Sequence, residues 1–156
     1  MRAILLLLMV LLGMPALAGP LDPGVAAAYA DLREAWRKLD AAGVMRHFAP
    51  SVHLLDGRHQ DLNYAGVQAT VEEALKGALS CEIEYQVKDW RPQGETIVAR
   101  VHQVRTIHYP SKSVCRVVER EDHWMRTPSG WQFFDVHFLH QEVTITSGSS
   151  SRRPNH

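Results

Sequence analysis

The sequence has little cysteine and no excess of charge of either sign. Its 156 residues include two cysteines, and 17 Lys and Arg balance 17 Asp and Glu. No run of basic residues is present, so the positive surface that binds nucleic acid is missing and we expect no nucleic-acid partner. The length fits one ordinary domain, and a hydrophobic fraction of 46% excludes a disordered chain.

Motifs for nucleophilic, cofactor and metal chemistry are also missing. There is no Gly-x-Ser-x-Gly elbow, no glycine-rich phosphate loop and no cysteine in a catalytic signature. Nine histidines are present, but none forms a His-x-His or His-x-x-x-His pair, and His137 and His140 are expected on opposite faces of a strand. We therefore predict no cofactor and no metal site.

The first 18 residues are typical of a secretory signal peptide. Residues 1–3 are a short basic start, residues 4–12 are apolar, and Ala16-Leu17-Ala18 is a small-x-small cleavage pattern. A membrane anchor is the alternative, but the apolar run is shorter than the roughly 20 residues that cross a bilayer. We predict cleavage after Ala18, a periplasmic or secreted protein, and no membrane association after cleavage.

Before residue 80 the sequence predicts three helices and one short strand. Asp22 is a typical N-cap, and Pro23 suits the first helical turn. Asp40 begins a second, short helix, and residues 51–56 alternate like a strand. The apolar stripes of the first and third helices, at spacings of three or four, are Val25, Tyr29, Leu32, Trp36 and Leu39, then Val67, Val71, Leu75 and Leu79.

From Cys81 to about Ile145 the hydrophobic pattern has a period of two. Four strands, joined by short turns, are expected to form an antiparallel meander at residues 81–88, 97–108, 114–126 and 131–144. Helices followed by a meander predict an α+β fold in which the helices cover one face of a curved sheet. We expect one domain over residues 19–146 and a disordered polar tail over 147–156.

Export would permit a disulfide between Cys81 and Cys115. In the predicted meander the two cysteines lie about two strand spacings, or about 9.5 Å, apart, whereas a disulfide tolerates a separation of about 7 Å. Buried free thiols are therefore favoured, and the disulfide stays as the alternative.

Six segments carry a resemblance to a known family, in the expected order along the chain: residues 32–36, 48–50, 56–57, 64–66, 121–124 and 130–137. Through them the chain resembles the nuclear-transport-factor-2-like (NTF2-like) cone-fold superfamily, which includes ketosteroid isomerases, polyketide cyclases and the calcium/calmodulin-dependent kinase association domain. The resemblance implies a cone-shaped, curved antiparallel sheet with the N-terminal helices on its concave face and a pocket between them. It implies no single function, since this fold hosts enzymes, binding modules and assembly domains.

Strand alternation then selects the residues that would point into the pocket. We expect Asp122 and Trp124 inward on the third meander strand, and Phe133, Asp135, His137 and Leu139 inward on the fourth. On the second strand we choose Arg100 and His102 over Ala99, Val101 and Gln103, although one bulge would reverse this choice. With Tyr29 and Trp36 from the first helix, the predicted ligand contacts are Tyr29, Trp36, Arg100, His102, Trp124, Phe133 and Asp135.

The predicted catalytic residues are Asp56, Asp122 and His137. The resemblance to ketosteroid isomerases implies Asp56 as a proton shuttle and Asp122 as a protonated donor to an enolate oxygen. Leu32 stands where those enzymes have a tyrosine, and Tyr29 lies one turn earlier. Structural alternatives are a turn cap for Asp56 and an ion pair for Asp122.

His137 has its own alternatives. With Asp135 two residues earlier, it is expected to act as a general base or as a polar anchor for a ligand. The alternative is a hydrogen-bonded histidine in the core of the cone.

We carry three functional hypotheses. The leading one is an exported protein that binds a small apolar or aromatic molecule in a pocket with a few acidic and histidine groups. The second is an isomerase, dehydratase or cyclase that uses pocket carboxylates for proton transfer, and the third is a non-catalytic interaction or assembly module. A homodimer through the outer sheet face is expected, to cover Ile97, Ala99, Val101, Phe134, Val136 and Phe138.

Overall fold

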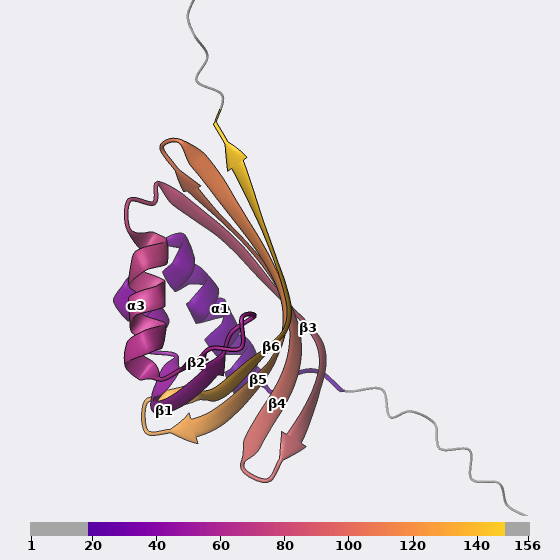
Figure 1. The fold of residues 1–156 in the computed structure, drawn as a ribbon. Coiled ribbons are helices and arrows are strands. Elements are labelled where there is room, and N and C mark those ends of the chain that lie inside the picture. The colour runs from indigo at the N-terminus through magenta and orange to yellow at the C-terminus, as the bar shows by residue number, and fades with distance from the viewer. Residues whose placement is uncertain (1–18, 149–156) are drawn as a thin grey trace, which may run out of the picture.

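A long, strongly bent sheet with helices on its concave side defines the architecture (Figure 1). The computed structural model describes residues 19–148, so the predicted signal peptide and residues 149–156 of the predicted tail lie outside the described residues. No helix within residues 19–148 has the length and apolarity needed to span a membrane. The elements are α1 (Pro23–Arg37), α2 (Ala41–Met45), β1 (Phe48–Leu55), β2 (Asp61–Leu62), α3 (Tyr64–Leu75), β3 (Ser80–Gln93), β4 (Thr96–Tyr109), β5 (Lys112–Thr127) and β6 (Gly130–Ser147).

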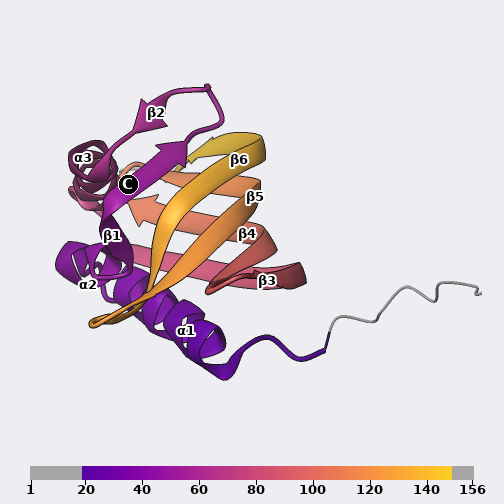
Figure 2. The same ribbon diagram turned by 90° about the horizontal axis from the view of Figure 1, so that it is seen from below.

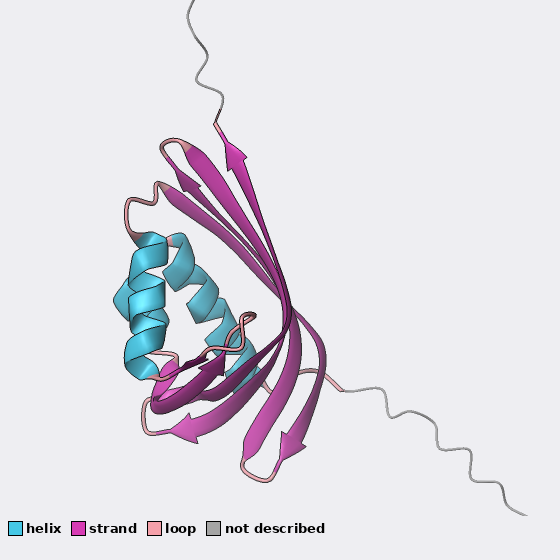
Figure 3. Cartoon of the chain, in the orientation of Figure 1, coloured by secondary structure: helices cyan, strands magenta, loops and turns pink. Residues whose placement is uncertain are grey.

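The six strands form one sheet in the order β2-β1-β6-β5-β4-β3. All neighbours are antiparallel except β1 and β6, which run parallel. Figure 3 shows the helices gathered on one side of this sheet, and Figure 2 shows the same arrangement from below. The α+β cone fold predicted from the sequence is confirmed.

Polar caps begin the helices. Asp22 Oδ1 accepts hydrogen bonds from the backbone N–H groups of Gly24 and Val25 at 2.8 and 3.2 Å, and Pro23 occupies the first helical position. Asp40 caps α2 in the same way, and Asn63 caps α3. Each cap satisfies a backbone donor that the first helical turn leaves free, so the helix starts are fixed locally.

The facing of β4 is opposite to our prediction. Ala99 and Val101 are fully buried against the helices, and Gln103 is 4% exposed on the same face. Arg100 is exposed, and His102 contacts Glu119 on the outer face. Both faces of the strand carry apolar residues, and the prediction that Arg100 and His102 point inward chose the wrong face.

A bulge on β6 reverses the facing of Asp135 and His137. Trp124 on β5 pairs with Phe133, but the next residue, His123, pairs with Asp135, so Phe134 is the extra residue. Val136 therefore turns inward and is 1% exposed, while Asp135 and His137 lie on the outer face. The prediction that these two side chains enter the pocket is wrong, because alternation assumes an unbroken ladder. Leu139, also predicted inward, is the extra residue of a second bulge on β6 and is 52% exposed.

The same geometry removes all but Phe134 of the residues on which the sequence argument for a dimer through the outer face rested. Ile97, Ala99, Val101 and Val136 belong to the buried core, and Phe138 packs against it. They need no cover from a partner chain, so the homodimer stays a prediction without these residues in its support. Cys81 and Cys115 are free thiols, on β3 and β5, with β4 between them.

Candidate functional site

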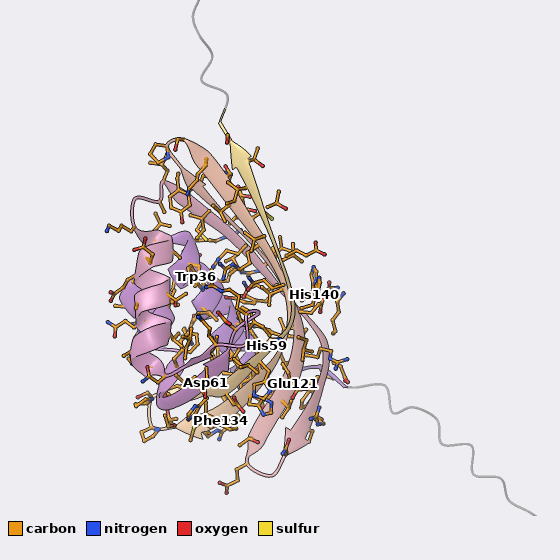
Figure 4. The ribbon with its side chains drawn as sticks, in the orientation of Figure 1. Trp36, His59, Asp61, Glu121, Phe134 and His140 are labelled. Atoms are coloured by element: carbon orange, nitrogen blue, oxygen red, sulfur yellow. The ribbon has the colours of Figure 1, made fainter. Side chains whose placement is uncertain are left out.

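A cavity of about 140 Å³ lies between the helices, β1 and the concave face of the sheet. Most of its wall is apolar and comes from α1, α3 and the strands. Trp36, which Figure 4 labels on the helix side, is one of these residues. The apolar lining consists of Leu32, Trp36, Phe48, Leu54, Leu62, Val67, Val71 and Phe138. An apolar cavity of about 150 Å³ holds benzene, so this one suits a single small ring.

The polar part of the wall is mainly basic. Arg105 on β4 and Arg116 on β5 are direct cross-strand partners on the concave face, and both line the cavity. Neither forms an ion pair with a carboxylate among residues 19–148. Like charges directly opposite each other on one face of a sheet are destabilising. Two unpaired guanidinium groups in one cavity therefore favour an anionic occupant.

Arg105 is held by packing and not by a carboxylate. Its guanidinium carbon lies 4.2 Å from the centre of the Trp36 ring, a cation–π distance. Burial, together with the nearby positive charge of Arg116, lowers the pKa of Arg105 to about 10. Arg105 still carries its charge at neutral pH, so it presents a fixed cation to the cavity.

Arg116 has a free donor. Its buried Nε has no hydrogen-bond partner in the described part of the chain. Burial and the charge of Arg58 lower the pKa of Arg116, and Asp56 opposes them. A buried N–H without an acceptor is costly, and a bound anion would supply the acceptor.

Asp56 lies at the mouth of the cavity, on the hairpin between β1 and β2. Its Oδ1 accepts hydrogen bonds from the backbone N–H groups of Arg58 and Gln60 at 2.8 and 2.9 Å. Figure 4 labels His59 and Asp61 on this hairpin. Partial burial raises the pKa of Asp56, but these N–H groups and the Arg58 guanidinium outweigh it, so the net pKa is lowered. Asp56 therefore acts as a turn cap that stays ionised.

Asp122 points inward, as predicted, but it is fully buried behind the cavity wall. Its Oδ2 accepts a hydrogen bond from the Tyr29 hydroxyl at 2.6 Å and another from the Arg120 guanidinium at 3.0 Å. Burial raises the pKa of Asp122, and the charge of Arg120 opposes that rise. The Trp124 indole N–H donates to the Tyr29 oxygen at 3.1 Å and completes the network.

The aromatic residues around this network fill the interior of the cone. The Trp124 and Phe133 rings have centroids 3.8 Å apart, and Tyr29 packs edge-on to Trp124 at 4.9 Å. Trp124 and Phe133 are fully buried and do not line the cavity. Of the ten predicted site residues, the cavity contains Trp36 and Asp56. Four belong to the core network (Tyr29, Asp122, Trp124 and Phe133), and four lie on the outer face (Arg100, His102, Asp135 and His137).

Sequence reasoning missed Arg105, Arg116 and Gln103. All three share the concave face with residues that are apolar in the sequence, such as Val101 and Val118. The hydrophobic pattern of β4 could have identified two of them. Ala99, Val101 and Ile107 form the more apolar of its two alternating sets, and Gln103 and Arg105 belong to that same set.

A larger hollow of about 670 Å³ lies elsewhere, between α1, the segment before β1 and the turn before β6. It is lined by charged surface residues, including Asp31, Glu34, Lys38 and Arg46. These side chains are both acidic and basic, so this hollow does not have the excess of positive charge found in the cavity inside the cone.

Comparisons with known proteins give matches among solved structures only. No family model matches the chain, and no curated protein matches it. A proposed scytalone dehydratase from Novosphingobium aromaticivorans superposes with a TM-score of 0.67 at 7% identity, over 85% of this chain and 93% of the other. A proposed dehydratase of the NTF2-like family from Streptomyces avermitilis gives 0.59 at 16% identity, over 74% and 91%.

A third structure, a proposed calcium/calmodulin-dependent kinase II association domain from Thiobacillus denitrificans, gives a TM-score of 0.57 at 18% identity, over 77% of this chain and 97% of the other. Together these similarities define the class: the chain has the NTF2-like fold. The fold resemblance predicted from the sequence is confirmed. Identities this low carry the fold and not the activity, so the function has to be argued from the site.

Proposed function

We propose that this chain is an exported protein that binds a small molecule with an apolar body and an anionic group, such as a carboxylate, inside the cone. One observation carries the proposal: Arg105 and Arg116 lie side by side on neighbouring strands of the cavity wall, and neither has an ion-paired carboxylate among the described residues. The apolar wall would contact the body of the ligand, and the two guanidinium groups would bind its acid group. Export rests on the pattern of residues 1–18.

The predicted acidic and histidine pocket is replaced by a basic one in this proposal. Arg105, Arg116 and Gln103 are among its polar groups, and Gln103 is buried, at 4% exposed. An amide and two guanidinium groups together offer more donors than a neutral ligand would satisfy. The volume of the cavity favours a ligand about the size of benzoate.

Proton-transfer chemistry receives less support from this geometry. Proteins of the same fold are described as dehydratases, which supports a small-molecule pocket in the cone. Of Asp56, Asp122 and His137, however, only Asp56 lines the cavity, and its pKa is lowered. A general base that works near neutral pH needs a raised pKa, so we propose binding and not turnover.

Titration with benzoate and its neutral analogue benzamide tests the binding proposal. We expect saturable benzoate binding by calorimetry. Benzamide should bind at least about tenfold more weakly, because the amide offers no charge-assisted hydrogen bond. Arg105→Gln and Arg116→Gln should each weaken benzoate binding by about tenfold. Arg100→Gln is the matched control, because Arg100 is an exposed arginine on the outer face.

Equal affinity for the acid and the amide would contradict the proposal. So would Arg116→Gln binding benzoate as tightly as the unaltered protein. Absence of saturable binding for benzoate and for cyclohexanecarboxylate alike would also overturn it.

A further inference from the structure

Two pairs of metal-ligating side chains lie together on the outer face of the sheet, outside the cavity. Glu121 on β5 is the direct partner of His137 on β6, and His123 is the direct partner of Asp135. The two pairs are adjacent along the strands and share one face, because the bulge at Phe134 sets Asp135 and His137 outward. A Glu-x-His segment and an Asp-x-His segment are thus side by side.

The distances suit a small cation. One ligand atom each from Glu121, His123 and His137 lies within 4.8 Å of the others. Ligands about 2.1 Å from a tetrahedral ion are about 3.4 Å apart, so small side-chain rotations would bring these three atoms to bonding distance. His123 and Glu121 are mostly buried, with side-chain exposures of 16% and 23%, which limits the conformational freedom that binding would cost.

We propose that Glu121, His123 and His137 form a binding site for a divalent transition-metal ion such as Zn²⁺. Two imidazoles and one carboxylate are a donor set that zinc, nickel and copper prefer over magnesium or calcium. Asp135 would contact a ligating histidine and not the metal ion. Its Oδ1 lies 3.0 Å from Nε2 of His137 and can orient that ring. The partial exposure of His137, at 42%, leaves an open side for water or another ligand.

The arrangement has an ordinary reading as surface hydrogen bonds. His123 Nε2 already lies 2.9 Å from Glu121 Oε1, and exposed His–carboxylate pairs are common and weak. That reading explains each pair but not why two imidazole rings lie against each other, with centroids 5.6 Å apart. Two protonated imidazole rings at this distance would repel each other, whereas two neutral rings could both ligate one metal ion.

Zinc titration of the untagged, chelator-treated chain tests the site. We expect one equivalent of Zn²⁺ to bind saturably by calorimetry, and His123→Ala and His137→Ala each to weaken it by about a hundredfold. Glu121→Gln removes the charge while nearly preserving side-chain size, and should weaken binding in the same direction. Circular dichroism of each variant without metal verifies that the fold is intact.

His102→Ala is the matched control. His102 contacts Glu119 one row along the same outer face, so it shares the surface chemistry but not the proposed site. Its zinc affinity should equal that of the unaltered protein. Saturable binding that survives both His123→Ala and His137→Ala, binding lost in His102→Ala, or no saturable binding at all would overturn the proposal.

Discussion

At the residue scale, the Arg105–Arg116 pair is the feature that folding alone does not explain. Both side chains sit on the concave face opposite each other, and Arg116 Nε is buried without an acceptor. Such a pair lowers the stability of the free protein through charge repulsion and an unsatisfied donor. A destabilising pair of this kind is consistent with a binding role, because binding sites often reduce the stability of the free protein.

Replacing Arg116 with Met should therefore stabilise the free protein. Met retains most of the apolar stem and removes the charge and the unpaired N–H, so the free energy of unfolding should rise by about 1 kcal/mol. Urea denaturation measures it as a higher midpoint at an unchanged slope. Arg100→Met on the exposed outer face should change stability by less than about 0.5 kcal/mol. A less stable Arg116→Met protein would contradict this view of the pair.

At the scale of elements, the sequence predicted which helices and strands exist better than which way they face. Caps such as Asp22 and the period-two pattern after Cys81 are local signals, and the elements formed where those signals lie. Facing depends on pairing with distant strands, and the bulge at Phe134 is defined only by β5. Asp122 lies on β5, which has no extra residue in its pairing with β4 or β6, and its inward position was predicted. His137 follows the bulge at Phe134, and its outward position was not predicted.

The hairpin between β1 and β2 depends on an ionised Asp56. The pKa of Asp56 is below its ordinary value of 3.8 in the folded chain, because N–H donors and Arg58 outweigh its partial burial. A lowered folded-state pKa adds stability that is complete above the ordinary pKa and is lost as the pH falls below about 4. The unaltered protein should therefore lose more unfolding free energy than Asp56→Asn between about pH 6 and about pH 3.

Denaturant titrations at a series of pH values provide this comparison. Asp31→Asn is the control, since Asp31 is an exposed carboxylate with no side-chain hydrogen bond to the described residues. Its pH dependence should follow the unaltered protein. If Asp56→Asn also does so, the carboxylate charge does not stabilise the hairpin.

At the scale of the whole molecule, the bent sheet separates two chemically different faces. The concave face carries the cavity and its arginines, and the convex face carries His102, His123 and His137 beside carboxylates. The concave face also carries fully buried core residues, among them Val136 and Asp122. The outer face thus carries polar side chains at Arg100, His102 and His137, and sedimentation analysis of the full chain will determine the oligomeric state.

The two proposed sites should bind their ligands independently. Glu121 and Arg116 are five residues apart on β5, which is about 16 Å of extended strand, and they lie on opposite faces. This separation exceeds the screening length of about 8 Å at physiological ionic strength, so the charge of a bound zinc ion should barely alter carboxylate binding. We expect the benzoate affinity with and without saturating Zn²⁺ to agree within about twofold. A change of about tenfold, matched by an equal change in zinc affinity when benzoate is bound, would instead reveal coupling through the sheet.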